Sequence, residues 1–286
     1  MSRRNTFEQY SARIEKVVAF LTDRLDQPLT LAQLAEAGHF SPFHFHRVYR
    51  GLMGETIAST QRRLRLHRAA AELIGERQAI ARIAARAGYG SVAAFTRAFG
   101  AVYGDAPAAF RKRRAALPAL PGAAFDPSLE TLMYTAQINT LAPIRVIALP
   151  HRGDYQTIGQ SFHALYAWAG PRGLMRADTR GIGIYYDSPA DTPVEQLRSE
   201  ACISAATDAV PGEGMRRVEI AGGRHAVVVH TGPYAELQRA YDWLFCQWLP
   251  ASGEEAGDAP VYEEYLNDPS QLPPSEWKTA ICLPLK

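Results

Sequence analysis

The stretch SPFHFHRVYR, residues 41–50, brings two histidines, two arginines and three aromatic side chains into ten positions. The His-x-His pair, His44 and His46, has the residue type that binds zinc. The neighbouring residues add no Cys, Asp or Glu, whereas a catalytic zinc ion normally has three protein ligands. We therefore expect no metal here. Arg47 and Arg50 instead suit an anionic partner such as nucleic acid, provided that the surrounding elements leave them exposed.

The stretch belongs to a unit that occurs twice. TLAQLAEAGHFSPFHFHRVYRGLMG, from Thr30, aligns with AIARIAARAGYGSVAAFTRAFGAVYG, from Ala79, at an offset of 49 that becomes 50 after one inserted residue. Each copy predicts a helix, a glycine turn and a second helix.

Local signals place the helix ends of the first copy. Thr30 and Gln33 can form a capping box, and Gly38 can adopt a positive φ where the first helix ends. Ser41 can cap the second helix, with Pro42 at its first position.

The helical period gives each second helix an inner and an outer face. The inner positions are apolar: Phe45, Val48 and Tyr49 in the first copy, and Phe95, Ala98 and Phe99 in the second. We expect the outer faces to be exposed, with Phe43, His44, His46, Arg47 and Arg50 in the first copy and Val92, Ala93, Thr96 and Arg97 in the second.

This arrangement is that of a helix-turn-helix, in which the second helix enters the major groove of DNA. Arg47 and Arg97, at matching positions, suit bidentate contact with guanine. The outer faces also offer side chains that can hydrogen-bond to bases or touch a thymine methyl group: His46, Thr96, Phe43 and Val92.

A continuous helix is expected between the two units. Residues 55–74, ETIASTQRRLRLHRAAAELI, contain no Gly or Pro. Twenty helical residues span about 30 Å, close to the roughly 34 Å between successive major-groove faces of B-DNA. One chain could thus present two reading helices. The arginines around this helix are expected to contact phosphates or to form a solvated face: Arg50, Arg62, Arg63 and Arg65.

The distribution of charge also separates the first half of the chain from the second. Residues 1–116 hold 19 Lys and Arg against 9 Asp and Glu, whereas the rest of the chain holds 12 against 20. A basic half fits double-stranded DNA. The three cysteines are scattered, and no apolar run approaches the length of a membrane span, so we expect a cytoplasmic protein without a membrane partner.

The second half has a repeat of its own. HRGDYQTIGQSFHALYAW, from His151, is similar to HTGPYAELQRAYDWLFCQW, from His230, at an offset of 79. GIYYDSPADTPVEQLRSEACI, from Gly183, is similar to EEYLNDPSQLPPSEWKTAICL, from Glu263, at about 80. Each copy predicts a strand, a turn, a helix and two strands, so the two copies form a pseudo-symmetric α+β unit with a groove between them.

Side-chain alternation predicts the groove residues. Gly183, Tyr185, Glu263 and Tyr265 share one side of their strands. A carboxylate between aromatic rings suits a cation, and Gly183 leaves room opposite Glu263. The alternative is that Glu263 lies on an exposed face, with Glu264 as an equal candidate. Trp168 either packs in the core or lines the groove.

The N-terminal half resembles the DNA-binding domain of AraC/XylS-type transcription regulators over about residues 10–114, through PLTLAQLAEAGHFSPFHFHRVYR, RRLRLHRAAAEL, IARIAARAGYGSVAAFTRAF and GDAPAAFRKRR. In the MarA, SoxS and Rob group the base-reading positions correspond here to Phe43, His46, Arg47, Ala93, Thr96 and Arg97. Some relatives have Trp and Gln where this chain has Phe43 and His46, and Ala93 offers no hydrogen bond, so the resemblance does not identify the operator.

The C-terminal half resembles the GyrI-like effector-binding domain over about residues 138–286, through HTGPYAEL, YEEYLNDP and TAICLPL. The domain order is similar to that of Rob-type regulators. The resemblance implies a groove that binds small, often cationic or amphipathic molecules with aromatic side chains and a central glutamate, which is Glu263 here.

We therefore expect two domains: an all-α double helix-turn-helix domain (8–114), a linker (115–133) and an α+β GyrI-like domain (134–286) of two strand-helix-strand-strand repeats. The expected function is a sequence-specific transcription activator that binds double-stranded DNA, RNA polymerase and a small effector. We expect no cofactor and no catalytic residue. The alternative is a small-molecule hydrolase or ligand scavenger with an appended DNA-binding domain, since some GyrI-like relatives are hydrolases that use the equivalent glutamate.

Overall fold

The computed structural model describes residues 3–75, 78–113, 134–206 and 208–286. The expected linker at 115–133 lies outside the described residues. The described N-terminal half is helical: α1 (Arg3–Asp23), α2 (Leu31–Ala37), α3 (Phe45–Met53), α4 (Ile57–Gly75), α5 (Ile80–Arg86), α6 (Val92–Tyr103) and α7 (Pro107–Arg113). No described helix is both long and apolar enough to span a membrane.

Of the two expected ends of the first helix in the first unit, the start is confirmed and the conformation at the end is wrong. The Thr30–Gln33 capping box is present. Gly38 has a φ of −96°, however, so the expected positive φ is wrong there, and His39 adopts it instead (φ 54°). Gly38 is needed for space, because a Cβ at this position would lie 2.7 Å from Phe40 and from Val17.

The second helix of the first unit also begins later than expected. It starts at Phe45 with His44 as its N-cap, so Ser41 is not the cap residue. The backbone carbonyl of Ser41 still accepts hydrogen bonds from the N–H groups of His44 and Phe45. In the second unit Ser91 caps α6, accepting a hydrogen bond from the N–H of Ala94.

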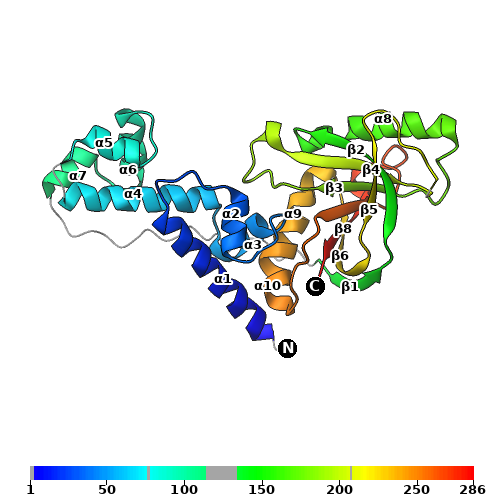
Figure 1. Cartoon of the computed structure of the whole chain (residues 1–286), viewed down its shortest axis with the longest axis horizontal. Helices are drawn as coiled ribbons and strands as arrows, with labels where there is room; N and C mark the ends of the chain where they lie inside the picture. The colour runs from blue at the N-terminus through cyan, green and yellow to red at the C-terminus, as the bar shows by residue number, and fades with distance from the viewer. Residues whose placement is uncertain (1–2, 76–77, 114–133, 207) are drawn as a thin grey trace.

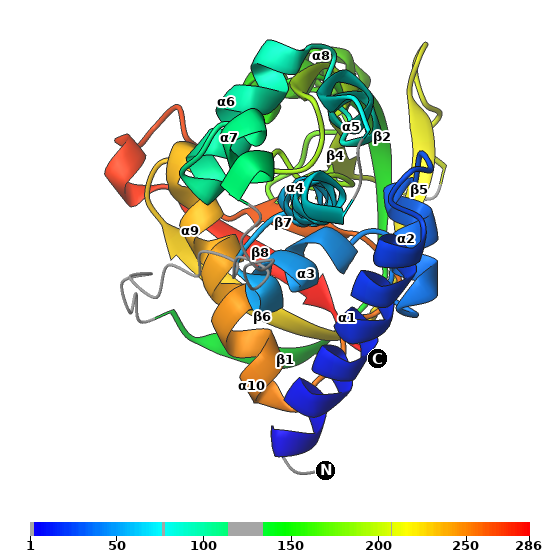
Figure 2. The same ribbon diagram turned by 90° about the vertical axis from the view of Figure 1, so that its left-hand side faces the viewer.

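The predicted connecting helix is confirmed as one continuous element. α4 has 19 residues and separates α2 and α3 from α5, α6 and α7, which lie at its two ends (Figure 1). Figure 2 looks along α4 and shows the second unit in front of the C-terminal domain. The second unit has a core of its own, formed by α4, α5, α6 and α7, with Ile83, Phe95, Phe99 and Phe110 buried.

The C-terminal half is an α+β domain built on one eight-stranded antiparallel sheet, curled into a half-barrel. Its strands are β1 (Ala136–Leu141), β2 (Ile144–Arg152), β3 (Gly181–Tyr185), β4 (Arg198–Ser204), β5 (Arg216–Ile220), β6 (Gly223–Thr231), β7 (Val261–Tyr265) and β8 (Lys278–Pro284). Its longer helical segments are α8 (Gly159–Ala169), α9 (Leu237–Asp242), the π-helical η5 (Trp243–Trp248) and α10 (Leu249–Ser252).

The sheet has the symmetry that the repeat predicts. Each copy runs strand, helix, strand, strand: β2, α8, β3, β4 and then β6, α9, β7, β8. The strand order β1-β6-β8-β7-β3-β4-β2-β5 places the two copies side by side at the β7–β3 pair. Helices α8 and α9 pack on the same face of the sheet, because Leu165 of α8 shares one apolar cluster with Ala201 of β4, and Leu237 of α9 shares another with Ile281 of β8.

The first helix-turn-helix unit shares a core with the C-terminal domain. Buried residues of α1 and α3 join those of α9, η5, β6 and β8 in one apolar cluster. The Tyr10 hydroxyl accepts a hydrogen bond from the N–H of Ala256 (3.1 Å), and Nε2 of His44 donates to the carbonyl of Ala259 (2.8 Å). α3 therefore lies against α9 and η5, as Figure 1 shows.

Candidate functional site

The first candidate site is a buried carboxylate at the centre of the sheet. Glu263 is only 4% exposed and lies on the sheet face that α8 and α9 cover. The Tyr241 hydroxyl, from α9, donates to Oε1 of Glu263 at 2.9 Å, and the Tyr265 hydroxyl donates to Oε2 at 3.2 Å. The Tyr185 hydroxyl lies 2.7 Å from that of Tyr265 and completes the chain. The structure thus brings Tyr185, Glu263 and Tyr265 together as expected.

Gly183 makes this arrangement possible. It pairs with Glu263 across the β3–β7 ladder. A Cβ at this position would lie 2.8 Å from both the Tyr185 ring and the Tyr265 hydroxyl. The two tyrosines therefore fill the space that a side chain at position 183 would need.

More aromatic side chains surround the site than the strand alternation predicted. The Tyr155 ring lies edge-on to Tyr185 with centroids 4.8 Å apart, and the Tyr234 ring meets Tyr265 at 5.4 Å. The Phe162 ring, from α8, also meets Tyr265 at 5.4 Å. Tyr155 and Tyr234 are the tyrosines of the repeated G-x-Y turn, so the repeat itself could have identified them. Tyr241 carries no such signal, because its counterpart at an offset of 79 is Phe162.

The surroundings change the acidity of Glu263. Burial raises the pKa of its carboxyl from 4.5 to about 7, although hydrogen bonds from Tyr241 and Tyr265 and the charge of Arg47 act in the opposite direction. Burial also raises the pKa of the Tyr185, Tyr241 and Tyr265 hydroxyls well above 10, so they remain protonated donors. A cation entering this site would favour the charged carboxylate and could lie against aromatic faces.

Two other sequence candidates lie elsewhere. Glu264 contributes to the opposite face of the sheet and forms a bidentate ion pair with Arg180, at 2.5 and 2.6 Å. It is thus not an equal candidate for the groove. Trp168 lies near the end of α8 against Gly212 and carries the Arg172 guanidinium over its ring. Among the described contacts none joins Trp168 to Glu263, so the structure does not bring it to this site.

The second candidate site is the outer face of α3, and here the expected exposure is wrong for two residues. His44 and His46 are only 1% and 4% exposed. Burial, followed by the charge of Arg47, lowers the pKa of His44 to about 3 and that of His46 well below 6.5. Both rings are therefore neutral groups packed between the two domains. The helical period identified residues that leave the core of their own unit, but the C-terminal domain covers them.

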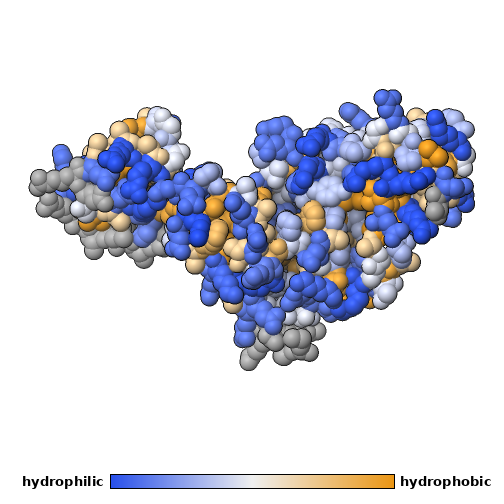
Figure 3. Space-filling model, in the orientation of Figure 1, coloured by the Kyte–Doolittle hydropathy of each residue, from blue (hydrophilic) through white to orange (hydrophobic). Residues whose placement is uncertain are grey.

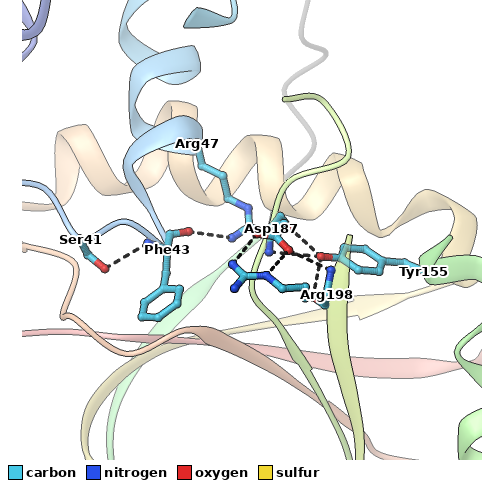
Figure 4. Close-up of polar contacts among 6 residues, drawn as sticks. All are labelled: Ser41, Phe43, Arg47, Tyr155, Asp187 and Arg198. Carbon is cyan, nitrogen blue, oxygen red and sulfur yellow. Dashed lines mark hydrogen bonds and ion pairs between the residues drawn. The ribbon is translucent and has the colours of Figure 1, made fainter. Parts of the chain in front are cut away.

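Arg47 joins the two candidate sites. Its guanidinium lies 4.7 Å from the Tyr241 ring centroid and 5.5 Å from that of Phe245. It also donates to the backbone carbonyl of Asp187 at 3.4 Å, a long hydrogen bond, as Figure 4 shows. Asp187 in turn is fixed by Arg198, through an ion pair of 2.8 Å.

The other outer residues of α3 also meet the C-terminal domain. The Phe43 ring lies 6.0 Å from the Tyr186 ring, and Arg50 pairs with Asp242 at 3.5 Å. Two hollows are present nearby. One, of about 10 Å³, is lined by residues that include Arg47 and Tyr241 and has room for about one water molecule. A second, of about 170 Å³, is lined mainly by apolar residues of the first unit, together with Asp191 of the C-terminal domain, and does not include Glu263.

The second unit presents its reading helix to solvent. Val92 is 42% exposed, Ala93 and Arg97 are exposed, and Thr96 is half-buried. Phe95 and Phe99 are buried as expected. In the space-filling view this unit stands apart from the C-terminal domain, with a notch above α4 between them (Figure 3). α6 is therefore accessible while α3 is covered.

Most of the arginines expected to contact phosphates have protein partners. Arg63 pairs with Glu55 at 2.6 Å, and Arg65 donates twice to the carbonyl of Leu25. Only Arg62 of the α4 arginines named above is exposed. No group of three or more His, Cys, Asp or Glu side chains that could hold a metal ion occurs within the described residues.

Two families match this chain. Residues 135–286 match the family described as a GyrI-like small molecule binding domain, and residues 34–113 match a family described as a helix-turn-helix domain. These matches confirm both resemblances found in the sequence, to an AraC-type DNA-binding half and to a GyrI-like half, together with the two-domain fold class.

Individual relatives are moderately similar. The "Probable transcriptional regulator YgiV" of Escherichia coli (strain K12) is 29% identical over 160 residues, covering 55% of this chain and 99% of that protein. The "DNA gyrase inhibitor" of Edwardsiella piscicida is 30% identical over 155 residues, covering 52% and 97%. A solved structure, "Cryo-EM structure of EcmrR-DNA complex in EcmrR-RPo", is 19% identical with a TM-score of 0.48 and covers 54% of this chain. The match spans 57% of that chain's length.

Proposed function

The chain belongs to the family of the GyrI-like small molecule binding domain and is a transcription regulator with a helix-turn-helix DNA-binding domain, and from this premise we propose that its effector is a small aromatic cation held at Glu263. The observation that carries this proposal is one nearly inaccessible carboxylate whose only described hydrogen-bond donors are tyrosine hydroxyls. No described Lys or Arg forms an ion pair with Glu263 within 4.0 Å, and the described cation that acts on it is Arg47, which lies over the Tyr241 ring.

The chemistry of the walls supports a cation in particular. Aromatic faces attract a positive charge, and Coulomb attraction strengthens where water is excluded. A neutral ligand would leave the Glu263 carboxyl either charged, with no ligand cation beside it, or protonated. The same site therefore distinguishes a cation from a neutral molecule of equal shape.

For the DNA-binding half, we propose sequence-specific reading by the outer residues of α6 and α3. Arg97 and Val92 are exposed at the positions that meet base edges in a helix-turn-helix. The residues proposed for contact with DNA are Phe43, His44, His46, Arg47, Arg50, Val92, Ala93, Thr96 and Arg97. Activation through contact with RNA polymerase is a further part of the proposal.

The effector proposal is tested with two compounds of nearly equal shape. Phenylguanidine is a planar aromatic cation, and phenylurea is its neutral counterpart. We expect phenylguanidine to raise the melting temperature of the full chain and phenylurea to leave it unchanged, because ligand binding to the folded state alone stabilises that state. Equal stabilisation by both compounds would exclude charge recognition at this site.

The DNA proposal is tested by capture of genomic fragments on the full chain, followed by sequencing. We expect a common motif among the bound fragments and binding that weakens steeply with salt. Enrichment without any shared motif would refute sequence-specific reading.

A second function is favoured by the acidity of the same carboxylate. A buried group with a pKa of about 7 is suited to act as a general base near neutral pH. The chain could then hydrolyse its ligand instead of only sensing it. Incubation of the full chain with ester or amide analogues of phenylguanidine distinguishes these roles, since product formation that Glu263→Gln abolishes would establish hydrolysis.

A further inference from the structure

The face of α3 that the repeat assigns to DNA is, in this structure, a contact surface for the C-terminal domain. His46 is 4% exposed, whereas its counterpart Thr96 on the equivalent helix α6 is half-buried and the neighbouring Arg97 is exposed. Nε2 of His44 donates to the carbonyl of Ala259, and Arg47 reaches the carbonyl of Asp187 (Figure 4). DNA cannot approach the α3 residues while these contacts exist.

One glycine shows that this contact is built into the sequence. Gly51 lies within α3, where glycine costs about 1 kcal/mol of helix stability relative to alanine. A Cβ at Gly51 would lie 2.8 Å from the carbonyl oxygen of Phe245 and 2.9 Å from Cα of Cys246, both in η5. The equivalent residue of the second unit is Ala101, which is exposed. Gly51 therefore permits a close approach of α3 to η5 that α6 does not make.

Arg47 supplies the chemistry that the effector site favours. Its guanidinium lies over the ring of Tyr241, and the hydroxyl of that same tyrosine donates to Glu263. The hollow beside Arg47 and Tyr241 has room for about one water molecule, so an aromatic ligand cannot enter through this side while α3 is in place.

The contact also leaves polar atoms without partners. Nδ1 of His44, Nε2 of His46 and Oδ2 of Asp191 are buried and have no hydrogen-bond partner among the described residues. Each such atom costs free energy that water or a base edge would recover after separation. The shared apolar cluster therefore favours the docked state, whereas these unpaired polar atoms oppose it.

We propose that the outer face of α3 has two mutually exclusive partners, DNA and the C-terminal domain, and that Arg47 acts in the docked state as a tethered cation that a free cationic effector displaces. This inference rests on the proposed function, because it takes Glu263 as the effector site and α3 as a DNA-reading helix. The effector binds better when α3 is undocked, and so does DNA. Each ligand therefore raises the affinity for the other.

Cys246 provides a reporter of the docked state. It lies in η5 beneath Gly51 and lines the same hollow as Arg47. The other two cysteines, Cys202 and Cys282, are 0% and 2% exposed within the sheet. Cys246 itself is half-buried. An increase in the rate at which iodoacetamide labels Cys246 over that of the wild-type chain, followed by peptide mass spectrometry, therefore reports the separation of α3 from η5.

The decisive pair of variants is Gly51→Ala and Gly100→Ala. Alanine at position 51 would strike the backbone of η5, whereas a Cβ at Gly100, in α6, would meet only the carbonyl of Asp105 at an ordinary 3.8 Å. Both changes favour their own helix. We expect Cys246 labelling about tenfold faster in Gly51→Ala, since an undocked state populated at a few per cent can rise by that factor. Gly100→Ala should label as the wild type does.

The experiment with the effector compounds also measures the rate of Cys246 labelling. Phenylguanidine should accelerate Cys246 labelling in the wild type, phenylurea should not, and Gly51→Ala should bind phenylguanidine more tightly than Gly100→Ala does. If phenylguanidine binds through Glu263 equally in all variants and leaves Cys246 labelling unchanged, the docking inference is overturned and the proposed function stands. If phenylguanidine binds nowhere, the effector proposal at Glu263 and the docking inference are both overturned.

Discussion

Gly183 and Glu263 are direct partners in the β3–β7 ladder, and each is also the counterpart of the other in the internal repeat. The pair therefore lies on the pseudo-two-fold axis of the sheet. Two glutamates here would face each other at the same point, and two glycines would leave no charge. The difference between the copies places one carboxylate at the centre, with the repeat-related Tyr185 and Tyr265 beside it.

Glu263→Gln should abolish the preference for a cation. The amide keeps the shape of the side chain but removes the charge that attracts phenylguanidine. We expect the stabilisation of the full chain by phenylguanidine to fall to that seen with phenylurea, measured as the shift in melting temperature. The matched control is Glu264→Gln, because Glu264 pairs with Arg180 on the other face of the sheet. Loss of cation binding in the control alone would contradict the assignment.

Gly183→Ala should destabilise the domain and close the site. The added methyl would lie 2.8 Å from two tyrosines that are themselves fixed by hydrogen bonds. Overpacking of this kind costs about 1 to 3 kcal/mol. Urea unfolding measures the cost, and Gly170→Ala is the control, because a Cβ at Gly170 would meet nothing within 4 Å. Equal stability of the two variants would show that the tyrosines move aside easily.

Cation binding should weaken as the pH falls through about 7. The folded-state pKa of Glu263 is raised above its ordinary value, so its contribution to folding stability is present below pH 4.5 and is lost as the pH rises through about 7. Only the charged form attracts a cation, so the affinity of phenylguanidine should fall by about tenfold for each pH unit well below that pKa. Calorimetric titration with phenylguanidine from about pH 5 to about pH 8, a range that brackets this pKa, measures how the affinity depends on pH. A profile that remains unchanged in Glu263→Gln would assign it to another group.

Arg97→Ala should weaken binding to the selected DNA and relax specificity at one base position. Arg97 is exposed on the accessible helix α6, and loss of a bidentate contact with guanine costs about 1 to 3 kcal/mol. Arg62→Ala, on α4, should weaken all sequences alike, because a phosphate contact carries no sequence information. Fluorescence anisotropy on the selected and a scrambled duplex compares them. Uniform loss in both variants would mean that Arg97 also binds only phosphate.

The repeated elements are predictable from the residues alone, because helical period, strand alternation and capping are local properties. The Thr30 capping box, the continuous helix α4, the two strand-helix-strand-strand copies and the grouping of Tyr185, Glu263 and Tyr265 all follow from such patterns. Even so, Gly38 showed the limit of this reasoning. Its position at a helix end predicted a positive φ, whereas packing against Phe40 and Val17 is what requires the glycine there.

The domain that covers the outer face of α3 is known only from the packing of the folded chain. Periodicity identifies the residues that leave the core of their own unit, but it contains no information about a second domain that packs on them. His44 and His46 are therefore buried where the pattern predicted exposure. Gly51 was the available signal for this contact. A glycine inside a helix lowers the stability of that helix, and it is often found where another backbone approaches closely. Tyr241 could not be assigned either, because its contact with Glu263 joins two elements that are distant in sequence and meet only when α9 packs on the sheet.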